Sequence, residues 1–214
     1  MRLYLSSMTY GTHPERLVQL AGRGSRVAIV MNALDNFPDE REHFARANQQ
    51  ALQDLGFIAD ELDLRAYFDA PGRLEQALER TGLIWVNGGN TFLLRRAMVR
   101  SGFDSVARAF LERDHLAYGG FSAGVCAITP SLRGIEFLDD PDALAEGYSP
   151  EVVWDGLGLI DYHVAVHYRT GDDEAIQKTV RYYRRNNMPY VALRDGEVIV
   201  VDGGRTDLIT LGSQ

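Results

Sequence analysis

The sequence has very little cysteine and lysine: Cys126 is its one cysteine and Lys178 its one lysine in 214 residues. A single cysteine excludes an intrachain disulfide and a zinc site built from several thiolates. A single lysine leaves almost no residue for a phosphate-binding P-loop or for Schiff-base chemistry. We therefore expect any phosphate or carboxylate to be recognised by arginine or by backbone N–H groups.

The chain also lacks a long apolar run and an excess of positive charge. No stretch reaches the roughly 18 apolar residues typical of a membrane-spanning helix, and the apolar run after Met1 is too short for a signal peptide. The formal net charge is −8 and the sequence pI is about 5.1, so the overall field repels phosphate backbones and anionic lipids. We expect a cytoplasmic protein with neither nucleic acid nor a membrane as partner.

What the chain does contain is an ordinary globular composition, with 45% hydrophobic and 24% charged residues. Its length suits one domain, because single hydrophobic cores keep growing up to roughly 250–300 residues. We expect residues 1–214 to form a single α/β domain. The 21 glycines exceed the usual share of ~7% and predict many tight turns between strands and helices.

Strand-like and helix-like segments alternate along the first half of the chain. The continuous apolar runs at 26–31 and 83–86 are typical of strands buried on both faces. Further strands are predicted at 3–6, 57–64 and 116–120, and helices at 39–55, 71–80, 92–100 and 104–113. This order predicts an α/β fold with a mostly parallel sheet sandwiched by helices, and functional residues at the carboxyl ends of the strands. Asp195-Gly196, between apolar segments at 190–194 and 197–201, predicts a C-terminal antiparallel hairpin.

The sequence Gly120-Phe121-Ser122-Ala123-Gly124 matches the G-x-S-x-G pattern of a nucleophile elbow. It follows a predicted strand and precedes a short segment of small residues. Such a turn needs small neighbours, and it exposes the serine hydroxyl beside backbone N–H groups that favour developing negative charge. We therefore expect Ser122 to be a nucleophile. The alternative is a turn at the strand end in which Ser122 only caps the next helix.

A second glycine loop, Gly88-Gly89-Asn90-Thr91, follows the predicted strand at 83–86. Two adjacent glycines can present their N–H groups to a small anion without a side chain in the way. This suits an oxyanion hole in which the amide of Ala123 is the other donor. The alternative is a tight turn with Asn90 or Thr91 as the helix N-cap.

The segment Asn87-Gly88-Gly89-Asn90-Thr91-Phe92, followed about thirty residues later by the serine elbow, resembles the peptidase E family of aspartyl dipeptidases, which is related to cyanophycinases. The resemblance extends over residues 3–201. It implies a fold similar to class I glutamine amidotransferases, with a serine in place of the amidotransferase cysteine. It also implies a serine peptidase that removes an N-terminal aspartate from short peptides, with Ser122 as nucleophile and the amides of Gly89 and Ala123 as the oxyanion hole.

The general base is chosen from five histidines: His13, His43, His115, His163 and His167. The segment at 162–168 alternates like a strand, and a strand parallel to the others places His167 at its carboxyl end. His163 then lies roughly 13 Å away, at ~3.3 Å per residue, which is too far for a shared metal site and favours a hydrogen-bonded core histidine. We expect His167 to be the base. The resemblance agrees, because the catalytic histidine of that family precedes an aromatic residue, although Val166 stands here in place of the usual proline.

The acid that orients the histidine is expected between Ser122 and His167 in the chain. The candidates are Glu136, Asp139, Asp140 and Asp142. Glu136 is flanked by apolar residues, where an unpaired carboxylate would be costly, whereas Asp139 and Asp140 precede a proline in what looks like a solvated turn. We expect Glu136 to complete the triad and keep Asp139 and Asp140 as alternatives. Many members of the resembling family have an aspartate near this place, so Glu136 is a departure that the same role tolerates.

These residues predict acyl transfer through an acyl-enzyme, a reaction that needs no metal or organic cofactor. Cys126 is expected in the core rather than at the site. Asn90, Arg133 and Arg169 are the candidate substrate-binding residues, because a guanidinium suits the carboxylate of an N-terminal aspartate. The expected partner is a small peptide, and the sequence leaves a homodimer open. A carboxylesterase that uses the same serine and a non-catalytic anion-binding module are the alternative functions.

Overall fold

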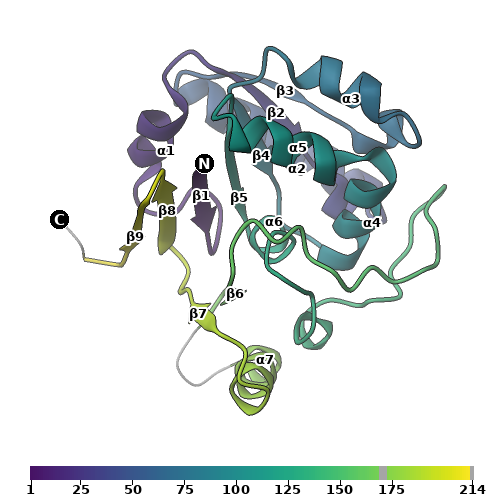
Figure 1. Cartoon of the computed structure of the whole chain (residues 1–214), viewed down its shortest axis with the longest axis vertical. Helices are drawn as coiled ribbons and strands as arrows, with labels where there is room; N and C mark the ends of the chain where they lie inside the picture. The colour runs from purple at the N-terminus through teal and green to yellow at the C-terminus, as the bar shows by residue number, and fades with distance from the viewer. Residues whose placement is uncertain (169–172, 213–214) are drawn as a thin grey trace.

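The computed structural model describes residues 1–168 and 173–212 of the chain (Figure 1). Its strands are β1 (Arg2–Ser6), β2 (Arg26–Val30), β3 (Ile58–Glu61), β4 (Leu83–Val86), β5 (Ala117–Phe121), β6 (His163–Ala165), β7 (Tyr190–Ala192), β8 (Val198–Asp202) and β9 (Arg205–Ile209). Its α-helices are α1 (Pro14–Ala21), α2 (Pro38–Asp54), α3 (Pro71–Leu78), α4 (Thr91–Ser101), α5 (Phe103–Glu112), α6 (Ala123–Cys126) and α7 (Glu174–Arg185). Three short 3₁₀ helices are η1 (Asn32–Leu34), η2 (Leu64–Tyr67) and η3 (Ile135–Phe137).

A seven-stranded sheet with the order β3-β2-β4-β5-β1-β8-β9 forms the centre of the molecule. The first five strands in this order run parallel, and β8 and β9 complete the sheet as antiparallel strands. The mostly parallel sheet with antiparallel strands at the C-terminal end confirms the predicted fold class. The carboxyl ends of β4 and β5 lie side by side, because Val86 pairs with Gly120. Both glycine loops therefore leave the sheet at the same edge.

Helices cover both faces of the sheet, as expected for strands that are apolar on both sides. On one face, Leu3, Ile84 and Val86 pack in a core with residues of α3, α4 and α5. On the other face, Tyr4, Ile29 and Trp85 pack with residues of α1 and α2. Burial of these alternating strand residues fixes which side chains can reach the edge of the sheet.

The predicted strand at 162–168 is shorter than expected and belongs to a different sheet. β6 pairs in parallel with β7, and these two strands form a small separate sheet beside α7 (Figure 1). The predicted hairpin across Asp195-Gly196 is wrong, because β7 and β8 belong to different sheets. The C-terminal hairpin is instead β8–β9, with Asp202 opposite Arg205. The Asp195-Gly196 segment is thus the connection that crosses from the small sheet to the large one.

Arg96 on α4 holds the long segment that connects η3 to β6. The side chain is buried, and its guanidinium donates hydrogen bonds to the carbonyls of Pro141, Ala143, Pro150 and Glu151. Four backbone acceptors around one guanidinium fasten this segment to the middle of α4. The start of the same segment contacts the second glycine loop through Asp139 and Asp140, which bond Thr91 and Asn90.

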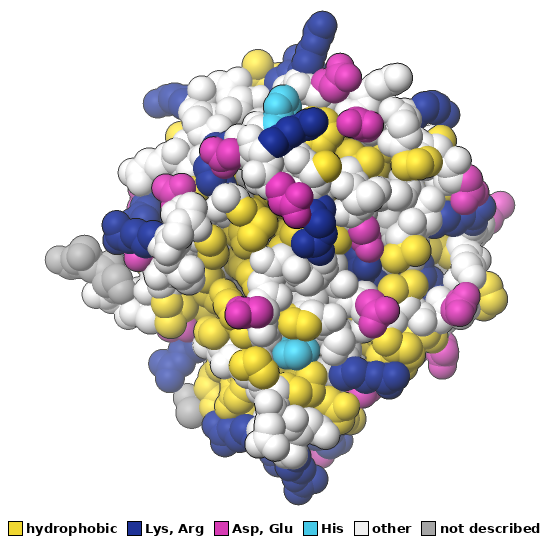
Figure 2. Space-filling model, in the orientation of Figure 1, with side chains coloured by type: hydrophobic (Ala, Val, Ile, Leu, Met, Phe, Trp, Pro, Cys, Tyr) yellow, Lys and Arg dark blue, Asp and Glu magenta, His cyan; other side chains and the backbone are white. Residues whose placement is uncertain are grey.

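The surface carries charges of both signs. Figure 2 shows basic and acidic side chains interspersed over one face, with hydrophobic side chains gathered near its centre. Within residues 1–168 and 173–212, no helix has the length and apolar character needed to cross a membrane.

Candidate active site

Ser122 lies on a sharp turn between β5 and α6. Its backbone angles are φ 51° and ψ −114°, which are unusual for a residue with a side chain. A Cβ at Gly120 or Gly124 would lie 2.8 Å or 2.5 Å from the carbonyl oxygen of Val86, so only glycine fits at these two positions. Ser122 occupies the N-cap position of α6, but its side chain makes no capping hydrogen bond. The turn therefore presents the hydroxyl for other interactions, as in a nucleophile elbow.

His167 contacts this hydroxyl. Its Nε2 lies 3.0 Å from Ser122 Oγ, which is hydrogen-bonding distance. The residue lies just beyond the carboxyl end of β6 and has a φ of 57°. Its backbone N–H donates a 2.7 Å hydrogen bond to Oγ of Ser7, the residue that follows β1. The structure thus brings together the two side chains expected to be nucleophile and base, although His167 comes from the small sheet rather than the large one.

Asp195 is the carboxylate next to the histidine. Its Oδ1 lies 2.7 Å from His167 Nδ1, and the two side chains are only partly exposed, at 20% and 29%. Ser7 Oγ lies 3.1 Å from the same Oδ1 and 3.3 Å from the carbonyl of Leu193. A hydroxyl, an imidazole and a carboxylate therefore form one continuous chain of hydrogen bonds, supported by Ser7.

Glu136 was expected to orient His167, but the carboxylate that lies against the histidine is that of Asp195. Glu136 lies in η3, and its Oε2 accepts a hydrogen bond from the backbone N–H of Gly134. The carboxylate is satisfied by its own turn, which is why it tolerates its apolar sequence neighbours. The acid against His167 follows the histidine in the chain instead of preceding it. The sequence signal that could have identified Asp195 is its position directly after a strand-like segment, which we interpreted as a hairpin turn.

The alternative acids are also occupied elsewhere. Asp139 accepts hydrogen bonds from the backbone N–H and the hydroxyl of Thr91, at 2.9 Å and 2.6 Å. Burial raises the pKa of Asp139, while these two hydrogen bonds and the nearby charge of His167 oppose the rise. Asp140 and Asp142 are exposed. Asp139 thus fixes the start of α4 beside the glycine loop.

The two expected oxyanion donors, Gly89 and Ala123, lie on either side of the serine turn. In the described part of the chain, no backbone hydrogen bond is made by the N–H of Gly89 or of Ala123. Gly89 has a φ of 138°, and a Cβ there would lie 2.5 Å from the carbonyl oxygen of Ala33. A Cβ at Gly88 would lie 3.0 Å from Cβ of Ser122, which shows how closely the glycine loop approaches the serine. Two unpaired N–H donors beside a hydroxyl can stabilise a developing oxyanion.

The expected substrate-binding residues have different surroundings. Asn90 is the N-cap of α4: its Oδ1 accepts from Leu93 N at 2.9 Å, and its Nδ2 donates to the carbonyl of Asp140 at 2.8 Å. Arg133 is exposed, and its guanidinium lies 3.8 Å from the ring centroid of Trp154. Arg169 lies outside the described residues. The amide of Asn90 thus fits the capping alternative, and among the described residues no contact places Arg133 at Ser122.

His163 and Cys126 lie in the core, as expected. His163 is 5% exposed, lies 3.4 Å from Ser131 Oγ through Nε2, and packs against the ring of Tyr183. Burial lowers the pKa of His163, opposed by its hydrogen bond with Pro189. Cys126 is 2% exposed, and burial raises the pKa of its thiol. A thiol held protonated in this way is a poor nucleophile.

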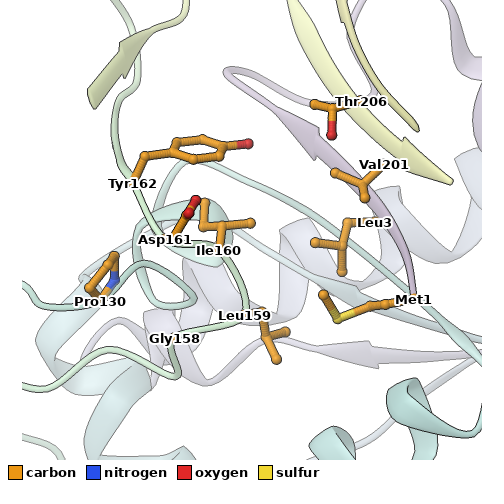
Figure 3. Close-up of a pocket in the computed structure, with 10 residues that line it drawn as sticks. All are labelled: Met1, Leu3, Pro130, Gly158, Leu159, Ile160, Asp161, Tyr162, Val201 and Thr206. Carbon is orange, nitrogen blue, oxygen red and sulfur yellow. The ribbon is translucent and has the colours of Figure 1, made fainter. Parts of the chain in front are cut away.

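One hollow of the surface lies away from Ser122. This groove of about 580 Å³ is lined mainly by apolar residues, including Met1, Leu3 of β1 and Ile160 of the segment before β6 (Figure 3). Its lining does not include Ser122, His167 or Asp195. Across residues 1–168 and 173–212, no cluster of three or more His, Cys, Asp or Glu side chains could hold a metal ion.

Comparisons with known proteins identify the family of this chain. Residues 10–209 match the family model described as peptidase family S51. The chain is 31% identical to a Streptomyces coelicolor protein named peptidase E, over 86% of this chain and 71% of that protein. It is 28% identical to an uncharacterized peptidase, Lmo0363, of Listeria monocytogenes, over 85% of this chain and 84% of that protein. A Drosophila melanogaster protein named as a probable alpha-aspartyl dipeptidase is 28% identical over 79% of this chain and 68% of its own length.

Solved structures show the same fold. A crystal structure of a candidate peptidase E protein from Listeria monocytogenes EGD-e superposes with a TM-score of 0.79 at 24% identity, covering 99% of this chain and 98% of that one. A peptidase from an acI-B1 Actinobacterium superposes with a TM-score of 0.71 at 13% identity, covering 97% of this chain and 86% of that one.

Proposed function

The chain belongs to peptidase family S51, and from this premise we propose that it is a serine-type peptidase that hydrolyses short peptides through an acyl-enzyme. The family supports a peptidase. The observation that carries the serine-type mechanism is the continuous hydrogen-bond chain from Ser122 Oγ through both ring nitrogens of His167 to Asp195 Oδ1. This is the arrangement by which a neutral hydroxyl becomes a nucleophile.

The first step is attack by Ser122 on the peptide carbonyl. Asp195 accepts a hydrogen bond from the Nδ1–H group of His167, which keeps that proton on Nδ1 and leaves the Nε2 lone pair, 3.0 Å from Ser122 Oγ, free to take the hydroxyl proton. The new bond from Oγ to the carbonyl carbon creates a tetrahedral oxyanion. The N–H groups of Gly89 and Ala123 stabilise that oxygen.

The second half of the reaction uses the same groups. The protonated His167 gives its Nε2 proton to the leaving amine, the C–N bond breaks, and an ester remains on Ser122. A water molecule, deprotonated by the same nitrogen, then attacks the ester and releases the acid product and the free serine. Asp195 stabilises the imidazolium in both steps. This sequence requires no metal or organic cofactor, and it works equally in a monomer or in a homodimer.

We propose dipeptides with an N-terminal aspartate as the substrate class. Support comes from the relative named for alpha-aspartyl dipeptides, and from the scarcity of lysine, which leaves arginine to bind the aspartate carboxylate. Arg133 and Arg169 are the proposed partners of that carboxylate. The capping role of Asn90 makes it a weaker candidate.

A dipeptide panel with a varied first residue tests this proposal. Purified wild-type protein and Ser122→Ala are assayed on Asp-Leu, Asn-Leu, Glu-Leu and Ala-Leu, and on a simple aryl ester. We expect hydrolysis of Asp-Leu with kcat/KM at least about 10²-fold above Asn-Leu, since a missing charge partner is strongly discriminated, and no hydrolysis by Ser122→Ala. Ester hydrolysis without dipeptide hydrolysis would identify a carboxylesterase. A wild-type protein inactive on every substrate would support the anion-binding module.

A further inference from the structure

The Gly88–Gly89 peptide carries one of the proposed oxyanion donors, and its orientation is not fixed by its own residues. A trans peptide points its C=O and its following N–H in opposite directions, and residues 1–168 and 173–212 contain no cis peptide bond. The direction of Gly89 N–H is therefore set by whatever holds the carbonyl of Gly88. Because both residues are glycine, the peptide can rotate by roughly half a turn without a Cβ clash. Such a flip would aim the carbonyl, instead of the N–H, at the oxyanion.

Asn87 holds this carbonyl. Its Nδ2 donates a 2.8 Å hydrogen bond to the carbonyl oxygen of Gly88, and the residue is 3% exposed. The bond leaves Gly89 N–H directed away from the Asn87 side chain. An amide can also present its oxygen to the same place, so Asn87 fixes the peptide only if its own orientation is fixed.

Asn48 on α2 fixes the orientation of Asn87. Asn48 Nδ2 donates to Asn87 Oδ1 at 2.9 Å, while Asn48 Oδ1 accepts from Trp85 Nε1 at 3.2 Å and lies 2.9 Å from the hydroxyl of Tyr10. An indole N–H can only donate, so the oxygen of Asn48 must face Trp85 and its amide nitrogen must face Asn87. Asn48 is 7% exposed, so water offers these groups little alternative. The indole N–H of Trp85 can only donate, so it sets the direction of each hydrogen bond in the series from Trp85 through Asn48 and Asn87 to Gly88.

We propose that Asn87, oriented by Asn48, is a positioning residue that keeps Gly89 N–H available to the oxyanion. The inference rests on the proposed function, because it assigns a cause to the donor orientation used there. Both asparagines act through their hydrogen bonds to one another and to Gly88. Their contribution is made through the Gly88–Gly89 peptide, and it should affect the transition state more than ground-state binding.

The hydrogen bonds from Trp85 through Asn48 and Asn87 to the carbonyl of Gly88 are called the relay below. Two isosteric substitutions reverse the direction of hydrogen bonds in this relay. In Asn87→Asp, a carboxylate replaces the amide donor, repels the Gly88 carbonyl and attracts Gly89 N–H, which favours the flipped peptide. In Asn48→Asp, the carboxylate still accepts from Trp85 and forces Asn87 to turn its amide nitrogen away from Gly88. The control is Thr179→Val, which removes a buried hydroxyl that bonds the carbonyl of Gly134, remote from the relay.

The experiment measures kcat and KM for the dipeptide that the wild-type protein cleaves best, together with the thermal midpoint of each variant. We expect Asn87→Asp to lower kcat by about 10²–10³-fold, as for loss of one oxyanion donor, with KM changed by less than about threefold. Thr179→Val, despite a similar fall in thermal midpoint, should keep kcat within about threefold of wild type. Asn48→Asp should lower kcat in the same direction, and it carries the test if Asn87→Asp does not fold.

The two proposals fail differently in this experiment. Failure of the proposed function appears as a wild-type protein that cleaves no dipeptide. Failure of the relay appears as an active wild-type protein in which the asparagine variants lose no more kcat than Thr179→Val, or lose activity through KM alone.

Discussion

Replacing Asp195 by asparagine should separate the acid at His167 from every other carboxylate near the site. The substitution keeps the shape of the side chain and removes its charge. The new amide can face His167 Nδ1, 2.7 Å away, with either its oxygen or its nitrogen. With the oxygen, the imidazolium loses its counter-charge. With the nitrogen, the imidazole must carry its proton on Nε2, where it can no longer accept the Ser122 proton.

The size of the effect follows from this geometry. His167 Nε2 is the only proton acceptor positioned at Ser122 Oγ among the described residues, at 3.0 Å, so the wrong tautomer removes the general base. Such a loss costs about 10⁴-fold in kcat in a serine triad. At 1.36 kcal/mol per factor of ten, that corresponds to about 5 kcal/mol of transition-state stabilisation. Ser7 Oγ lies near the same atom of residue 195, so it can accept from the new amide nitrogen while donating to the carbonyl of Leu193, and the fold should tolerate the change.

The assay compares Asp195→Asn with Glu136→Gln in steady-state dipeptide hydrolysis, with the thermal midpoint of each variant as a folding control. Glu136 bonds only the turn at Gly134 among the described contacts, so its variant should keep kcat within about threefold of wild type. The assignment of Asp195 is refuted if Asp195→Asn keeps near-wild-type kcat. Loss of activity in Glu136→Gln together with that result would assign the role to Glu136.

Three further outcomes are expected. Gly89→Ala places a Cβ against the carbonyl of Ala33 at a positive φ, so unfolding free energy should fall by about 1–3 kcal/mol and kcat should fall with it; urea melts and kinetics that match wild type would contradict this. Ser7→Ala removes the hydrogen-bond acceptor of the His167 backbone N–H, so the free energy of unfolding should fall by about 1–3 kcal/mol in urea melts. In the kinetic assay, kcat should fall by a larger factor than KM changes. His163 has a lowered pKa, so the folded state binds fewer protons and stability is lost as pH falls below 6.5. The thermal midpoint of His163→Gln should therefore fall less than that of wild type between about pH 7.5 and about pH 5, and an equal fall in the two proteins would contradict this.

Much of the fold follows from the sequence because its central strands are apolar on both faces. The run at 83–86 corresponds to β4 at both ends, and the helices at 92–100 and 104–113 correspond to α4 and α5 within one residue at each end. The glycine spacing around Ser122 also has a local cause, since Val86 excludes a side chain at Gly120 and Gly124. Glycines required by such local steric contacts can be recognised from the sequence alone.

The third member of the proposed triad was not visible in this way. Asp195-Gly196 has the composition of a hairpin turn, and nothing local distinguishes a turn from a crossover between two sheets. The distinction depends on the pairing of β7 with β6 and of β8 with β1, which are distant in sequence. The same holds for Asn48 and Ser7, whose partners are brought near only by the packed sheet and α2.

Reaction with a small fluorophosphonate most directly tests the claim that Ser122 is a nucleophile activated by His167. The mass of the intact labelled protein is measured by mass spectrometry, and the labelled residue is located by peptide mapping after digestion. Both measurements are made on the wild type, Ser122→Ala and His167→Ala. We expect one label per chain on Ser122, none on Ser122→Ala, and a labelling rate at least about 10²-fold lower for His167→Ala. A wild-type protein that stays unlabelled, or that is labelled at another residue, would contradict the mechanism.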